Sequence, residues 1–181
     1  MFTEAWFALG EQGPTARANF ELADPGRALV IGTLLYYEVQ PSAQARTDTG
    51  LLGNISSRAS LNPSATLIAG FIIHERPRKV VIRGVGPTLR QFDVLSPVED
   101  PQLTVHSGSA LLAQNDNWSA GSPANTAALV TAFSQVGAFA LPEGSTDAAL
   151  LIELPPGAYT AHLRSALPAA GDALLEVYVL P

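Results

Sequence analysis

The chain has 181 residues, of which 47% are hydrophobic and only 14% are charged, and its formal net charge is −6 at pH 7. This composition supplies the apolar surface of one sizeable folded domain and excludes a chain that is disordered over most of its length. The acidic balance argues against nucleic acid as a partner, because phosphates require a basic surface, and the absence of cysteine excludes disulfides and thiolate metal sites.

Short apolar runs separated by Gly, Pro, Asn and Asp dominate the chain and predict strands joined by turns. Strands are expected over residues 16–22, 28–39, 51–60, 66–74, 78–85, 102–106, 110–114, 148–154, 157–165 and 173–180. The continuous run in 66–74 is typical of a central strand that is buried on both faces. No run approaches the roughly 18 apolar residues of a membrane-spanning helix, so no membrane span is expected.

The strand expected over 157–165 alternates, so that Tyr159 and Leu163 share one face and His162 and Arg164 share the other. Glu153 and Glu176, on the neighbouring predicted strands, are expected to face outward.

One helix interrupts the strands, in the sequence SPANTAALVTAFSQVGAF. Ser122 is suited to the N-cap and Pro123 to the first helical position. Leu129 and Phe133 then follow at helical spacing, and Gly137 can close the C-terminus. About ten short strands and this helix together predict an all-β fold, a β-sandwich of the jelly-roll type with one short helix.

The polar segment 40–50, QPSAQARTDTG, is rich in small residues and predicts a linker or long loop. It separates an N-terminal β arm or hairpin, residues 1–39, from a β-sandwich domain, residues 51–181. The arm contains the apolar segment ALVIGTLLYYEV, which must pair with another strand to avoid aggregation. It either pairs within its own chain or completes a neighbour's sheet by strand addition. The candidate assembly residues are Leu29, Ile31, Leu34 and Tyr36.

The octapeptide QNDNWSAG, residues 114–121, is a candidate metal or sugar site. The oxygens of Asn115, Asp116 and Asn117 suit a calcium ion, which would be structural and would need carboxylates from elsewhere in the chain. Trp118 could stack on a sugar ring. The alternative is a turn made by the Asn and Asp side chains, with Trp118 covering the core.

The segment 76–90, RPRKVVIRGVGPTLR, holds five of the ten basic residues. Arg76, Arg78 and Arg83, together with Trp118 and His106, are candidate ligand-binding residues for a sulfated or uronic polysaccharide. The alternative is a solvated turn at Arg76 and Arg78, with Arg83 paired to a carboxylate inside the protein.

Catalytic patterns are missing from the sequence. His74, His106 and His162 lie on predicted strands or strand ends, and none belongs to an H-E-x-x-H motif. No G-x-S-x-G nucleophile motif is present either. We therefore expect that the protein is not an enzyme and needs no cofactor other than the calcium ion considered above.

The blocks IRGVGPTL, QNDNW and LPPGAYT carry a resemblance over residues 51–181. They resemble a domain that recurs in large secreted proteins of environmental bacteria such as Verrucomicrobia, and the second half is similar to pre-peptidase C-terminal domains. The resemblance implies an extracellular, non-catalytic β-sandwich. The N-terminus, MFTEAWFALG, lacks the basic head of a signal peptide, which leaves either a cytosolic protein or a processed or excised piece of a larger one. The resemblance favours the processed or excised piece.

The leading hypothesis is a structural or adhesive module at a bacterial cell surface or outside the cell. Its partners would be other copies of itself or neighbouring domains of a surface protein. The alternative is a carbohydrate-binding accessory module with a structural calcium site.

Overall fold

The computed structural model describes residues 31–34 and 53–181 of the chain. The strand predicted over 16–22 and the linker predicted over 40–50 lie outside these residues. So do Leu29 and Tyr36 of the predicted arm. In the described part, no helix is long and apolar enough to cross a membrane.

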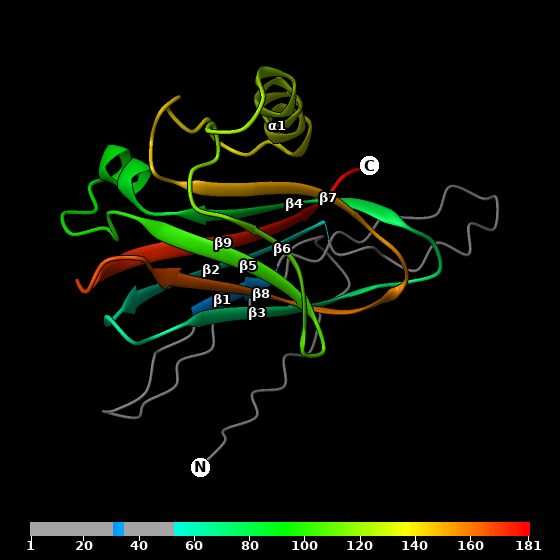
Figure 1. The fold of residues 1–181 in the computed structure, drawn as a ribbon, viewed down its shortest axis with the longest axis horizontal. Coiled ribbons are helices and arrows are strands. Elements are labelled where there is room, and N and C mark those ends of the chain that lie inside the picture. The colour runs from blue at the N-terminus through cyan, green and yellow to red at the C-terminus, as the bar shows by residue number, and fades with distance from the viewer. Residues whose placement is uncertain (1–30, 35–52) are drawn as a thin grey trace, which may run out of the picture.

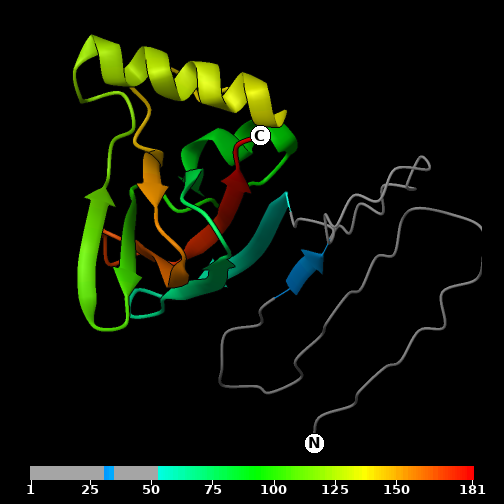
Figure 2. The ribbon, with the colours of Figure 1, turned by 90° about the vertical axis from the view of Figure 1, so that its right-hand side faces the viewer.

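Nine strands of the described chain form two antiparallel sheets that pack face to face (Figures 1 and 2). The five-stranded sheet has the order β1-β2-β9-β4-β7, and the four-stranded sheet has the order β3-β8-β5-β6. The strands are β1 (Ile31–Leu34), β2 (Asn54–Leu61), β3 (Leu67–Ile73), β4 (Arg78–Val85), β5 (Pro101–Ser107), β6 (Ala110–Asn115), β7 (Ala148–Leu154), β8 (Gly157–Ser165) and β9 (Gly171–Val179).

The pairing of these strands is nested. β2 pairs with β9, β3 with β8, β4 with β7 and β5 with β6, all antiparallel. Eight strands paired in this way behave as one long hairpin rolled into two sheets, which is the jelly-roll arrangement. The predicted fold class is therefore confirmed.

The helix α1 (Pro123–Val136) begins and ends where its caps predict. The Ser122 hydroxyl accepts a hydrogen bond from the Asn125 amide, and Gly137 closes the helix with a φ of 70°. A short 3-10 helix, η1 (Pro87–Phe92), follows β4 and was not expected from the sequence. Both helices lie over the outer face of the five-stranded sheet (Figure 1).

Two apolar clusters hold these layers together. The larger one fills the space between the sheets and takes the inward-facing residues of the alternating strands, such as Leu103, Tyr159, Leu163 and Leu175. The smaller one lies between the five-stranded sheet and α1 and includes Leu129, Phe133 and Trp118. In β8, the predicted alternation is confirmed, because Tyr159 and Leu163 are buried while Arg164 is exposed.

The expectation that residues 66–74 form a central strand is wrong. β3 lies at the edge of its sheet, and among the described residues it pairs only with β8. Its inward side chains are buried, but Ile68 is 49% and Ile72 is 73% exposed. A run of apolar residues shows that a strand is hydrophobic, but it does not show whether the strand pairs with other strands on one side or on both. The sequence therefore could not distinguish an edge strand from a central one.

Candidate functional site

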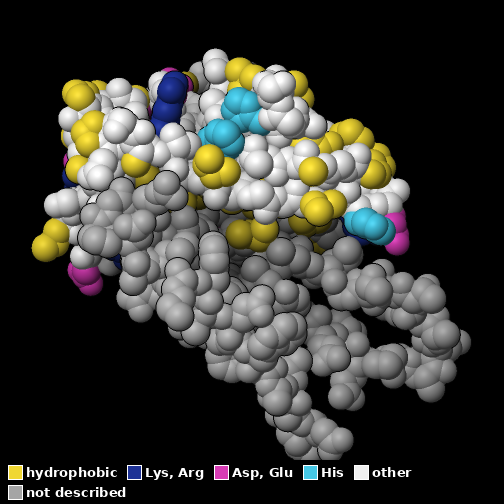
Figure 3. Space-filling model, turned by 90° about the horizontal axis from the view of Figure 1, so that it is seen from below, with side chains coloured by type: hydrophobic (Ala, Val, Ile, Leu, Met, Phe, Trp, Pro, Cys, Tyr) yellow, Lys and Arg dark blue, Asp and Glu magenta, His cyan; other side chains and the backbone are white. Residues whose placement is uncertain are grey.

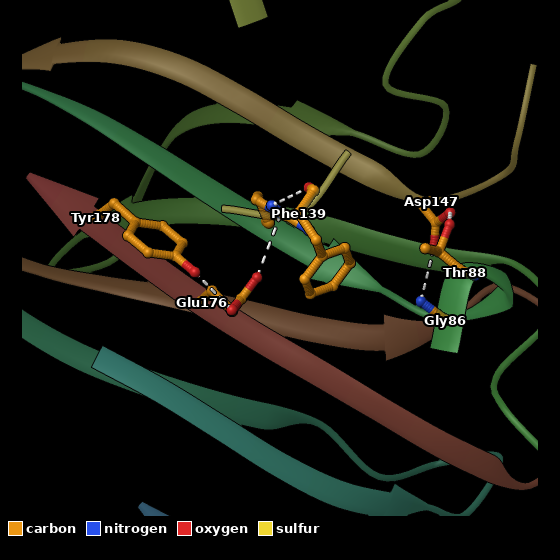
Figure 4. A network of polar contacts seen from close by, with 7 residues as sticks. Gly86, Thr88, Phe139, Asp147, Glu176 and Tyr178 are labelled. Carbon is orange, nitrogen blue, oxygen red and sulfur yellow. Dashed lines mark hydrogen bonds and ion pairs between the residues drawn. The ribbon is translucent and has the colours of Figure 1, made fainter. Parts of the chain in front are cut away.

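A buried ionic cluster lies on the outer face of the five-stranded sheet, beneath α1. Figure 4 shows its side chains from close by. Arg83 on β4 and Glu176 on β9 are opposite each other in the strand register, and Arg83 Nε lies 3.2 Å from Glu176 Oε2. The Tyr178 hydroxyl donates a 2.7 Å hydrogen bond to Glu176 Oε1. Glu176 was expected to face solvent and is only 5% exposed, so that expectation is wrong.

The surroundings of Arg83 explain how a charged side chain is held in the core. Its Nη1 donates a 2.8 Å hydrogen bond to the Phe139 carbonyl. Its guanidinium carbon lies 4.2 Å from the centre of the Phe139 ring and 4.9 Å from that of Phe133. Burial lowers the pKa of Arg83, while Glu176 opposes that shift. Arginine nevertheless stays protonated in proteins, so the cluster contains a charged pair.

The phenol of Tyr178 is held in its donating form. Burial, followed by the nearby Glu176 carboxylate, raises the pKa of Tyr178 well above its ordinary value. The hydroxyl therefore keeps its proton and continues to donate to Glu176.

Asp147 joins two segments, its own residues 145–147 before β7 and residues 86–88 at the other end of β4 (Figure 4). Its carboxylate is fully buried and accepts hydrogen bonds from the Gly86 amide at 2.8 Å and from the Thr88 hydroxyl. The Ser145 hydroxyl also donates to it, at 2.8 Å. Gly86 is required here, because a side chain at this position would collide with the Val98 carbonyl at 2.1 Å. These hydrogen bonds fix the loop after β4 to the loop before β7.

The QNDNWSAG segment forms a structural turn in this fold. The Asn115 side chain donates to the Asn117 carbonyl at 3.3 Å and accepts from the Ala149 amide at 3.0 Å. Trp118 is buried, and its indole N–H donates to the Pro142 carbonyl at 3.0 Å. In the part of the chain that the structure describes, no group of three or more His, Asp and Glu side chains could hold a metal ion.

Two carboxylates do lie near each other beside this turn. Burial and the negative charge of Asp116 raise the pKa of Asp100 above its ordinary value of 3.8. Asp100 Oδ1 is buried and has no hydrogen-bond partner among the described residues. Calcium at Asp116 and Asn117 stays a prediction, and Asp100 is the carboxylate that could join it.

The charge of Asp100 should therefore lower stability at neutral pH. The protonated form of Asp100 is the one that the folded protein favours. The stabilisation that it gives is fully present below the ordinary pKa and is lost as the pH rises through the raised pKa of the folded protein. We expect the D100N variant to melt at a higher temperature than the natural chain at about pH 7 and at the same temperature at about pH 3. Thermal unfolding followed by circular dichroism at both pH values measures the difference.

The control for this variant is E153Q, because Glu153 is exposed on β7 and lies outside the turn. An equal gain in E153Q, or no gain in D100N, would contradict the prediction. The same melts with calcium and with a chelator test the ion site. Calcium bound between Asp100 and Asp116 would raise the melting temperature of the natural chain and not that of D100N.

The candidate polysaccharide residues are separated by the fold. Arg83 is 0% and Trp118 is 2% exposed, so neither can contact a polysaccharide. This corrects both expectations and supports the alternatives, an internal ion pair for Arg83 and a core position for Trp118. Arg76 and Arg78 remain at the surface and line a hollow with Lys79.

His106 lies on the outer face of the four-stranded sheet, whereas Arg78 and Lys79 belong to β4 of the five-stranded sheet. Its ring stacks on that of His162 with 4.6 Å between centroids, and each Nε2 lies 3.0 Å from a threonine hydroxyl on its own strand. Figure 3 shows histidine side chains side by side on one face of the molecule, next to hydrophobic ones. Burial and the neighbouring His106 lower the pKa of His162 below 6.5. The sequence predicted the strands but not this contact.

No protein-family model and no curated protein matches the chain. A solved structure of the pre-peptidase C-terminal domain of a collagenase from Bacillus anthracis is similar, with a TM-score of 0.42 and 11% sequence identity. The match covers 68% of this chain and 88% of that chain. A likeness of this size establishes neither a family nor a function.

Proposed function

We propose that this chain is a non-catalytic structural module, part of an extracellular or cell-surface assembly of bacteria, that joins its copies through sheet edges. The observation that carries the proposal is the edge of β3 that has no partner strand among the described residues. Its seven residues, LIAGFII, include no charged residue and no proline. A long apolar edge of this kind is a template for another strand.

The other edges of the two sheets differ from β3. β6, at the opposite edge of the same sheet, has a register shift opposite Val105 and His106, and such bulges interrupt pairing. β7, at one edge of the five-stranded sheet, carries the charged and exposed Glu153. Natural proteins protect edges with bulges and charges. β3 has neither device, which favours pairing between copies.

The N-terminal arm offers a second contact. β1 contributes four residues to the edge of the eight-residue β2, from Ile31 opposite Arg58 to Leu34 opposite Ile55. In this structure the pairing is within one chain. An arm that pairs instead with β2 of a neighbour would exchange the same contact between copies. Each copy would then have two contacts, arm exchange at β2 in one sheet and β3–β3 pairing in the other. Because the two contacts use different edges, each copy could bind two neighbours and the copies would form an open filament.

The β3 contact is tested by the double variant I68K/I72K in the full chain. Both side chains are exposed, so the lysines fit the folded monomer, but identical charged edges would repel each other. We expect the concentration needed for assembly to rise about tenfold or more. Size-exclusion chromatography with light scattering over a concentration series measures it.

The matched control is L95K/V130K, which adds the same charge at residues that are 91% and 52% exposed and lie away from β3. Equal loss of assembly in both variants would mean that net charge, and not the β3 edge, controls association. A natural chain that stays monomeric at all concentrations would refute the proposed assembly.

The arm is tested by the variant G32P/T33P. Successive residues of a strand direct their N–H groups to opposite sides, so two adjacent prolines remove one N–H that points toward β2. We expect this variant to retain β3-mediated dimers and to lose longer assemblies. Light scattering that still detects filaments would exclude arm exchange.

A further inference from the structure

The beginning of β4, the last turn of α1 and the end of β9 surround a surface hollow of about 640 Å³. Its charged side chains, Arg76, Arg78 and Lys79, are all basic, and Pro181 also lines it. Gln135 and Leu180 contribute an amide and an apolar surface. We propose that this hollow binds the anionic group, sulfate or carboxylate, of an acidic polysaccharide.

Within residues 31–34 and 53–181, no carboxylate forms an ion pair with the three cations. The ion pairs of this part of the chain involve Arg58, His74, Arg83 and Arg90, and none includes a cation of the hollow. Glu153 is opposite Lys79 in the register of β4 and β7, yet the two side chains form no ion pair. In a chain with a net charge of −6, a cluster of three basic side chains that lacks ion pairs to the described residues is a local exception to the acidic character of the protein.

The backbone that carries these cations is fixed. The Arg76 amide donates a 2.7 Å hydrogen bond to the His74 carbonyl, which closes a tight turn before Pro77. The Lys79 carbonyl accepts a 2.9 Å hydrogen bond from the Leu180 amide. Arg78 is held in the β4–β7 register opposite Leu154. A fixed backbone lowers the entropy lost when the side chains close on a ligand.

The chemistry of the lining suits an oxyanion on a sugar. A guanidinium donates two parallel hydrogen bonds to a sulfate or carboxylate, and an ammonium group adds a compact positive charge. The Gln135 amide can bond a sugar hydroxyl, and Leu180 can contact the apolar face of the ring. Binding should weaken with added salt, because exposed charges are screened. This site does not depend on strand addition, since β3 belongs to the other sheet.

The test measures binding of the full chain to dextran sulfate, to polygalacturonate and to neutral dextran by isothermal titration calorimetry at low ionic strength. The variant R76Q/R78Q/K79Q removes the basic lining. The control R58Q/R90Q/R164Q removes three exposed cations elsewhere and gives the same net charge. We expect the first variant to lose about tenfold in affinity for the anionic polymer and the control to lose about threefold at most.

The two anionic polymers distinguish a sulfate site from a carboxylate site, and binding of either one supports the proposal. Three results would overturn it: no binding of either polymer by the natural chain, equal loss in the two variants, or equal binding of neutral dextran. Thermal melts of both variants establish that they are folded. Assembly through β3 is measured separately by light scattering. A negative binding result would therefore refute the polysaccharide site without deciding whether β3 joins the copies.

Discussion

The variant R83M is expected to lower the free energy of unfolding by about 3–5 kcal/mol, because it leaves a buried carboxylate without its cation. Glu176 would keep the hydrogen bond from Tyr178 but would lose the guanidinium 3.2 Å away. The Phe139 carbonyl would lose its donor as well. A loss of this size is a large share of the 5–15 kcal/mol by which typical domains are stable.

Urea denaturation measures this loss, with R58M as the matched control. Arg58 pairs with Asp172 at 2.7 Å, but both side chains are partly exposed, so this pair should contribute less than about 1 kcal/mol. The double variant R83M/E176M should be more stable than R83M, since an apolar pair leaves no unpaired charge. Equal losses in R83M and R58M would show that burial does not control the energy of the Arg83 pair.

The variant D147A is expected to lower the free energy of unfolding by about 4 kcal/mol, because it removes a buried acceptor shared by four donors. The amides of Gly86 and Thr88 and the hydroxyls of Thr88 and Ser145 would all lose this partner. D147N keeps the size of the side chain but turns one acceptor into a donor, so we expect most of the loss to remain.

The control is E153A, which removes an exposed carboxylate from β7, the strand that directly follows Asp147. It should change stability by less than about 0.5 kcal/mol. Hydrogen exchange adds a local measurement, since the Gly86 amide should exchange faster in D147A than the global loss of stability requires. A D147A variant as stable as E153A would contradict the assigned role of the carboxylate.

The sequence alone determined the elements whose signals are local. The helix could be bounded because Ser122, Pro123 and Gly137 act on the backbone within one turn of themselves. The faces of β8 followed from alternation, since successive side chains of any strand point in opposite directions. These signals, with the number of strands, were sufficient for the all-β sandwich.

Only the tertiary structure decided which of these elements are neighbours. Arg83 and Glu176 lie 93 positions apart by their numbers, and only the β4–β9 register brings them together beneath Phe139. For the same reason, the exposure of β3 depends on its place at the end of the order β3-β8-β5-β6. The basic hollow likewise needs the end of α1 and the end of β9 to lie beside β4. Local sequence sets the conformation and polarity of each segment, but burial, pairing and cavities arise from contacts between distant segments.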